Sequence, residues 1–275
     1  MRQAVIFTDL DGTLLDYTTY SFEKALSALS LIRRKKVPLV ICSSKTKREI
    51  EYYRQRLGND HPFISENGGG IYIPKDYFGL HVRLEGLEIR REDGYLVIRL
   101  GARYGDLRRV VETLRQEGFR IKGFGDMTAK ELSEAANMTI VEAEMARQRD
   151  FDEPFVFEGD EAKADRLFGR IRSEGFSVTR GRFFHILGDS DKGKAVTILA
   201  DFYKKKFGEI TTIAIGDSPN DITMLENVDH PVIVQRPDGT YDARIDLPGL
   251  EKADGIGPEG WNRAVLAVLT GKLPE

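Results

Sequence analysis

Asp9-Leu10-Asp11-Gly12-Thr13 stands near the start of the chain, separated by one residue from the apolar run 4–7. A second acidic motif, Gly216-Asp217-Ser218-Pro219-Asn220-Asp221, follows the apolar run 213–215 far downstream. Each run is short, rich in β-branched residues and closed by turn-forming residues, so each is typical of a buried strand that carries carboxylates at its carboxyl end. Two acidic strand tips on neighbouring strands predict a magnesium site.

The composition limits the classes of protein to which the chain can belong. The chain has 275 residues, 41% of them hydrophobic, and a net charge of −3, which suits one large globular domain or two smaller ones. No run of like charge is long enough for a nucleic-acid arm or a membrane-binding patch, so we expect neither partner. The start of the chain has no signal-peptide pattern and no apolar stretch could span a bilayer, which predicts a cytoplasmic protein. Nothing in the sequence indicates an oligomeric state.

Strand and helix patterns alternate at both ends of the chain. After the first strand, a helical pattern at 21–36 leads into a second strand and a second helix, which is the rhythm of a parallel sheet covered by helices. The pattern changes between residues 83 and 187, where mixed strands and helices indicate antiparallel pairing. We therefore predict a Rossmann-like α/β core from residues 1–82 and 188–275, with a second α/β module, residues 83–187, inserted into it.

The two acidic motifs resemble those of the haloacid dehalogenase superfamily of aspartyl phosphotransferases, whose first and fourth motifs are DxDGT and GDxxND. Ser43, just past the second strand, matches the serine or threonine of the second motif, and Lys192, which opens a helix, matches the lysine of the third. Taken alone, Ser43 and Ser44 are more typical of a helix cap, and a solvated lysine is a reasonable interpretation of Lys192. The resemblance implies that the inserted module is a cap domain over the catalytic core.

The first motif suits the hydrolysis of a phosphate monoester, whose negative oxygens repel nucleophiles and whose alkoxide leaves poorly. Asp9 would attack phosphorus and form an aspartyl-phosphate, while Asp11 would protonate the leaving oxygen and then activate water. Mg²⁺ would be held by the Asp9 carboxylate, the Asp11 carbonyl and Asp217, with Asp221 orienting that shell. The expected phosphate-binding residues are Ser43, Ser44, Lys192 and Asn220.

Within the superfamily, the chain resembles the mannosyl-3-phosphoglycerate phosphatase family over nearly its whole length. This resemblance rests on Ile41-Cys42-Ser43-Ser44-Lys45-Thr46, Gly123-Phe124-Gly125-Asp126-Met127-Thr128, Arg147-Gln148-Arg149-Asp150-Phe151-Asp152-Glu153-Pro154-Phe155 and Gly181-Arg182-Phe183-Phe184-His185. It implies hydrolysis of a phosphorylated sugar acid, mannosyl-3-phosphoglycerate, to mannosylglycerate and phosphate, the second step in making a compatible solute. The expected substrate-binding residues are Lys45, Glu66, Asn67, Gly68, Arg149, Arg182 and His185.

Other interpretations stay open at this point. Surface ion pairs or packing explain Arg149, Arg182 and His185 as well as substrate contact does. A glucosyl-3-phosphoglycerate phosphatase, a broader sugar-phosphate phosphatase or a phosphomannomutase would use the same motifs. A sugar-phosphate sensor is disfavoured because every charged group for turnover is present. A nucleotide-binding P-loop at 188–194 is disfavoured because Ala195 stands where a hydroxyl should hold Mg²⁺.

Overall fold

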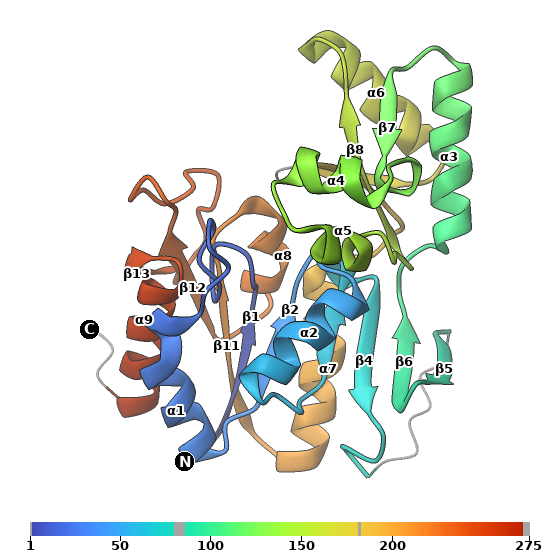
Figure 1. The fold of residues 1–275 in the computed structure, drawn as a ribbon. Helices are drawn as coiled ribbons and strands as arrows, with labels where there is room; N and C mark the ends of the chain where they lie inside the picture. The colour runs from blue at the N-terminus through green and yellow to red at the C-terminus, as the bar shows by residue number, and fades with distance from the viewer. Residues whose placement is uncertain (1, 80–85, 181–182, 272–275) are drawn as a thin grey trace.

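A computed structural model describes residues 2–79, 86–180 and 183–271 of the chain. Within these residues Figure 1 shows two sheets, the smaller one standing above the larger. The strands of the larger sheet follow the order β13 (Glu251–Ile256), β12 (His230–Gln235), β11 (Ile210–Gly216), β1 (Gln3–Thr8), β2 (Leu39–Cys42), β3 (Phe63–Ser65), β4 (Gly70–Pro74), β6 (Tyr95–Arg99) and β5 (Glu88–Glu92). Strands β13 to β3 run parallel, whereas β4, β6 and β5 pair antiparallel.

The parallel strands are buried on both faces, as a sheet covered by helices on both sides requires. In β1, Ile6 belongs to one apolar cluster, while Val5 and Phe7 on either side belong to the other. Burial of each such side chain stabilises the fold by about 1.5–3 kcal/mol. The helices on one face are α1 (Leu26–Lys35), α2 (Lys47–Leu57) and α9 (Pro258–Thr270), and those on the other are α7 (Lys192–Phe207) and α8 (Ile222–Leu225).

The smaller sheet is antiparallel throughout. Its order is β7 (Ile121–Gly123), β8 (Asp152–Phe157), β10 (Phe184–Leu187) and β9 (Ser177–Arg180). The long helices α3 (Tyr104–Gln116) and α6 (Glu161–Ser173) bury an apolar stripe against it, including Leu107, Val111 and Leu167. The short helices α4 (Ala129–Ala136) and α5 (Ile140–Ala146) pack together and lie close to the carboxyl ends of the parallel strands (Figure 1).

A largely parallel Rossmann-like sheet with an antiparallel α/β module confirms the predicted fold class. The division into domains stays a prediction. The larger sheet continues beyond residue 83, where the inserted module was predicted to begin. Strands β5 and β6 hydrogen-bond to one another, and β6 pairs with β4, so the larger sheet extends to Arg99. Strand β13 is an addition to the predicted elements, because its alternating exposed residues at a sheet edge lack the apolar run of the inner strands.

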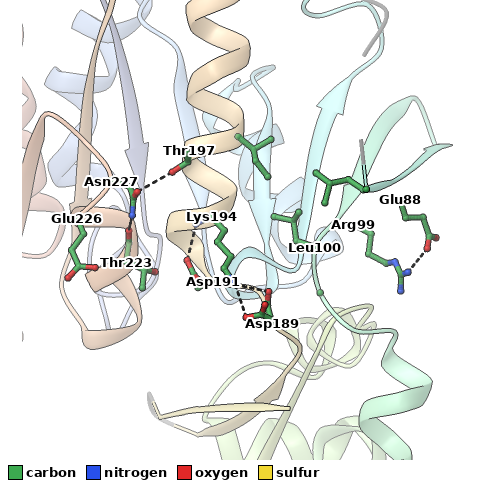
Figure 2. Close-up of a pocket in the computed structure, with 14 residues that line it drawn as sticks. Glu88, Arg99, Leu100, Asp189, Asp191, Lys194, Thr197, Thr223, Glu226 and Asn227 are labelled. Carbon is green, nitrogen blue, oxygen red and sulfur yellow. Dashed lines mark hydrogen bonds and ion pairs between the residues drawn. The ribbon is translucent and has the colours of Figure 1, made fainter. Parts of the chain in front are cut away.

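Two connections join the larger sheet to the smaller one, near residues 100–103 and 188–191, and they touch. A Cβ atom on Gly188 would lie 2.5 Å from the Ala102 nitrogen, so only glycine fits there. Beside them is a groove of about 770 Å³, which Figure 2 shows. Among its charged residues, Lys194 pairs with Asp189 at 2.7 Å and Arg99 pairs with Glu88, and none of its lining residues is a carboxylate of the two acidic motifs.

None of the helices among the described residues combines the length and the apolar character needed to cross a membrane.

Candidate active site

The carboxyl ends of β1 and β11 bring the two acidic motifs together. Thr8 pairs with Ile215 at the last register position of these strands, and the Asp9 nitrogen donates to the Ile215 carbonyl at 3.0 Å. Carboxylate oxygens of Asp9, Asp217 and Asp221 consequently lie within 4.8 Å of one another, and all three residues are buried. This is the convergence that the strand-end argument predicted for the two motifs.

Lys192 is the cation at the centre of this cluster. Its Nζ donates to Asp9 Oδ1 at 2.8 Å and to Asp221 Oδ1 at 2.6 Å, and its side chain is fully buried. The solvated-lysine alternative is therefore wrong. One ammonium faces three carboxylates, so full ionisation would leave two buried negative charges uncompensated. Burial, together with the neighbouring carboxylates Asp221 and Asp11, raises the pKa of Asp9 to about 7 against the lowering effect of Lys192.

The surplus negative charge and the all-oxygen donor set fit a hard divalent cation. Burial and the nearby Asp221 also raise the pKa of Asp217 well above its ordinary value, which marks a site that lacks positive charge. Asp221 has a second task, because its Oδ2 accepts from the backbone nitrogens of Asp217 at 3.1 Å and Ser218 at 3.2 Å. Asp221 therefore shapes the loop that presents Asp217.

Gly12 lets the first motif turn against the second. Its φ is +74°, and a Cβ atom would lie 2.8 Å from Asp217 Oδ2. The next residue, Thr13, donates from Oγ1 to Asp217 Oδ1 at 3.1 Å. Asp11 reaches the opposite side, where Lys45 Nζ lies 3.0 Å from its Oδ2 and 3.4 Å from Glu49 Oε1. Lys45, two residues before α2, thus holds Asp11 in place.

Ser43 and Ser44 follow β2 and precede α2, but neither caps that helix. Thr46 is the cap, because its side chain accepts from the Glu49 nitrogen and the Glu49 carboxylate accepts from the Thr46 nitrogen. Ser43 is buried, and its Oγ accepts from the Lys45 nitrogen at 3.3 Å. The cap alternative for the two serines is therefore wrong, while Ser44 lines the same cavity as Asp9 and Asp11.

Glu66 and Gly68 lie in a short turn, η2 (Glu66–Gly68), and have structural contacts there. The Glu66 carboxylate accepts from the nitrogens of Asp150, Phe151 and Asp152 at 2.9–3.0 Å, so it fixes the start of β8. Burial raises the pKa of Glu66 to about 8 despite the nearby Arg149. A Cβ atom on Gly68 would lie 2.1 Å from the Asp191 carbonyl oxygen. Neither residue is among those that line the cavity, and their expected contact with substrate stays a prediction.

A chain of polar contacts crosses from the core motifs to the smaller sheet. Asn220 Nδ2 donates to Asn67 Oδ1 at 3.1 Å, and Asn67 Nδ2 donates to Asp152 Oδ2 at 3.0 Å. Asp152 also contacts His185 Nδ1 at 2.9 Å. Arg149 donates to the Ser44 carbonyl at 2.8 Å and lies 3.7 Å from Asp152. Asn67, Arg149, His185 and Asn220 all line the cavity, whereas Arg182 lies outside the described residues.

These residues surround a cavity of about 510 Å³ between the larger sheet and the smaller one. Sequence reasoning missed several residues of its wall, namely Tyr17, Tyr20, Arg180, Arg236, Asp242 and Arg244. Arg236 comes directly after β12, so the strand-end rule could have found it. The others stand in no motif, and their approach to the site depends on how the loops fold.

The fold and the clustered carboxylates indicate the class of protein, and comparison with known protein families indicates the same class. A family model described as haloacid dehalogenase-like hydrolase matches residues 6–240. The chain belongs to this haloacid dehalogenase-like hydrolase family, as its two motifs predicted.

Particular relatives narrow the class. The chain is 45% identical over 267 residues to the glucosyl-3-phosphoglycerate/mannosyl-3-phosphoglycerate phosphatase of Methanococcoides burtonii, covering 96% of this chain and 97% of the relative. It is 42% identical to the phosphatase of the same name from Persephonella marina, covering 96% and 97%. A crystal structure from Thermoplasma acidophilum shares the fold, with a TM-score of 0.70, 16% identity and coverage of 98% and 99%.

Proposed function

We propose that this protein is a Mg²⁺-dependent phosphatase that hydrolyses mannosyl-3-phosphoglycerate to mannosylglycerate and phosphate, a step in the synthesis of a compatible solute. The observation that carries the proposal is the cluster of Asp9, Asp217 and Asp221 around Lys192, open to a cavity of about 510 Å³. The substrate is taken from the names of relatives at 42–45% identity. Those names also include the glucosyl compound, so we expect it as a second substrate. The cytoplasmic location stays a prediction.

The chemistry follows from the charges around Asp9. An Asp9 oxygen attacks phosphorus, the bond from phosphorus to the glycerate oxygen breaks, and Asp11 gives that oxygen a proton. A water oxygen then attacks the aspartyl-phosphate while Asp11 takes the water's proton, which releases phosphate and restores Asp9. Lys45 holds Asp11 at 3.0 Å, and Lys192 holds Asp9 at 2.8 Å.

Asp9, Asp217 and the Asp11 carbonyl would hold Mg²⁺, with Asp221 orienting the shell. When bound, the ion supplies positive charge for the phosphoryl oxygens. Ser43, Ser44, Lys192 and Asn220 remain the proposed phosphate-binding groups. Of these, Lys192 and Asn220 already have protein partners, at 2.6–2.8 Å and 3.1 Å respectively, and would share their donors with the phosphate.

The test is phosphate release with Mg²⁺, with and without EDTA, from mannosyl-3-phosphoglycerate, glucosyl-3-phosphoglycerate, mannose 6-phosphate and 3-phosphoglycerate. We expect metal-dependent release from the two glycosylated phosphoglycerates far above that from the two fragments. Equal or faster release from mannose 6-phosphate would contradict the substrate and leave a broader sugar-phosphate phosphatase. A dependence on a sugar bisphosphate activator, with transfer back to the sugar, would instead reveal a phosphomannomutase.

A further inference from the structure

The cavity wall carries more cations than phosphate binding requires. Its basic residues outside the Lys192 cluster are Lys45, Arg149, Arg180, His185, Arg236 and Arg244. Three of them have nearly buried side chains that already contact protein groups. Lys45 binds Asp11 and Glu49, and His185 binds Asp152. Arg149 donates to the carbonyls of Ser44 and Ala146, and only 5% of its side chain is exposed. These three therefore have few donors left for a ligand.

Arg244 and Arg236 belong to a rigid cluster in the loop between β12 and β13. Arg244 donates to Asp242 through Nε at 2.9 Å and Nη2 at 2.6 Å, and Arg236 Nη1 donates to the same carboxylate at 3.2 Å. The side chain of Asp242 is 4% exposed, so the pair of arginines is anchored on a buried acid. Arg236 also lies 3.4 Å from Asp238, so two carboxylates face the two guanidinium groups. Arg244 uses one edge of its guanidinium, and its Nη1 donors stay available for a second carboxylate.

Arg180 approaches the cavity from the other side. It ends β9, and its guanidinium lies 4.9 Å from the centre of the Phe184 ring on the neighbouring strand. This stacking orients the guanidinium without using its N–H donors. Among the described residues no carboxylate pairs with Arg180. Strand β9 packs against the turn η4 (Pro219–Asp221), which belongs to the second acidic motif. Arg180 therefore projects from the smaller sheet beside the catalytic loop.

The same cavity is therefore lined by two kinds of charged group. Asp9 and Asp217 are acidic and suit a phosphate only together with a cation, whereas Arg180 and Arg244 have guanidinium donors that no hydrogen bond among the described residues uses. We propose that Arg180 and Arg244 together bind the carboxylate of the substrate's glycerate, and that Asp242 and Arg236 hold Arg244 in position. This assignment rests on the proposed function, and it replaces Arg149 and His185 as the receptor for that carboxylate.

The experiment compares two substrates, mannosyl-3-phosphoglycerate and its neutral carboxamide, in the full-length enzyme with Mg²⁺. We expect Arg180→Gln and Arg244→Gln each to lower kcat/KM for the carboxylate substrate about 10- to 100-fold, mostly through KM, because each removes a charge-assisted hydrogen bond. The rate with the carboxamide should change by less than about threefold. Arg170→Gln in α6 and Arg263→Gln in α9, which pair with Glu117 and Asp254 away from the cavity, are the matched controls.

Each outcome is decisive. If Arg180→Gln and Arg244→Gln lower both substrates equally, or neither, the assignment is wrong. It is also wrong if Arg149→Gln alone removes the preference for the carboxylate. Should Arg244→Gln fail to fold, Arg244→Lys keeps the charge but not the planar fork, and must still reduce the preference. A wild-type enzyme that releases phosphate from mannose 6-phosphate but from neither glycosyl substrate would overturn the proposed function, and this inference with it.

Discussion

At the scale of single residues, a substitution at Asp9 distinguishes an effect on catalysis from an effect on folding. Replacing it with asparagine removes the nucleophile but keeps the shape of the side chain, and Lys192 keeps Asp221 as a partner at 2.6 Å. We expect Asp9→Asn to lower phosphate release by about 10⁴-fold or more. The circular dichroism spectrum and the Tm should stay close to those of the wild type, because the change also relieves repulsion among buried carboxylates. Substantial phosphate release by Asp9→Asn would exclude an aspartyl-phosphate on this residue.

Asp126, which lies just after β7, makes the stability of the folded protein depend on pH in the acidic range. Burial opposes its ionisation, but hydrogen bonds from Arg108, Arg115 and the Gly123 nitrogen outweigh that effect and lower the pKa of Asp126 to about 2. A carboxyl group whose folded pKa lies below its unfolded value of 3.8 stabilises the fold above that value and loses the effect as the pH falls to about 2. Since Asp126 is partly solvent-screened, we expect the contribution to be about 1 kcal/mol.

The corresponding measurement is urea unfolding of Asp126→Asn and wild type between pH 7 and pH 3. Asp126→Asn should be less stable at pH 7, and the gap should narrow steadily below pH 4. Asp201→Asn, at an exposed site in α7 with one weak ion pair, serves as the control and should change stability by less than about 0.5 kcal/mol. A gap that stays constant down to pH 3 would show that the ionised form of Asp126 is not what stabilises the fold.

The residues that sequence reasoning placed correctly are those whose position follows from one strand. Asp9 and Asp217 stand at the ends of buried parallel strands, so their meeting is a consequence of topology. Arg149 and Glu66 differ, because their partners are backbone groups of segments far along the chain: the Ser44 carbonyl for Arg149 and the Asp150 to Asp152 nitrogens for Glu66. No local pattern predicts such contacts, so the sequence alone could propose these two residues only as candidates for substrate binding.

At the scale of elements, the turn η2 and the start of α7 depend on one glycine. Gly68 has a φ of +92°, and a Cβ atom there would lie 2.1 Å from the Asp191 oxygen and 2.9 Å from the Lys192 nitrogen. We expect Gly68→Ala to cost about 3 kcal/mol or more and to reduce kcat, because α7 must shift and carries Lys192 with it. Gly79 is the matched control, since its φ is +63° and nothing lies within 4 Å of its Cβ position.

Thermal unfolding and phosphate release of the two alanine variants test this argument. Gly79→Ala should show only the strain of a left-handed alanine, about 1 kcal/mol, with full activity. Similar losses of stability in both variants would mean that the contact with Asp191 relaxes easily and does not position Lys192.

Elements with strong apolar patterns were predictable, and edge elements were not. The buried strands β1 and β11 contain the apolar runs 4–7 and 213–215 that predicted them. Strand β13 alternates exposed and half-buried residues at a sheet edge and contains Gly255, which weakens strand propensity. Strand β5 has the sequence EIRRE, and its membership of the larger sheet depends on pairing with β6. Whether β13 and β5 form strands therefore depends on tertiary pairing, which the local sequence does not encode.

At the scale of the whole molecule, the buried charge at the strand ends couples the fold to a bound cation. Three carboxylates share one ammonium, so the protein without metal contains electrostatic repulsion in its core. An ion that binds only the folded chain stabilises it by about 2.7 kcal/mol at a concentration 100 times its Kd. Mg²⁺ should therefore raise the Tm of the wild type.

The substitution Asp217→Asn should affect stability in opposite directions without and with the ion, because it removes both the repulsion and a ligand of the ion. Burial and the neighbouring Asp221 raise the pKa of Asp217, so its charge costs stability in the absence of metal, while the oxygen of an asparagine can still accept from Thr13. In EDTA we expect Asp217→Asn to melt at a higher temperature than the wild type, and in excess Mg²⁺ at a lower one. This reversal, read by calorimetry, requires no turnover. If the variant is less stable than the wild type in EDTA, Asp217 stabilises the fold even without metal. That result would contradict the claim that the Asp217 carboxylate destabilises the metal-free protein and is compensated by a bound cation.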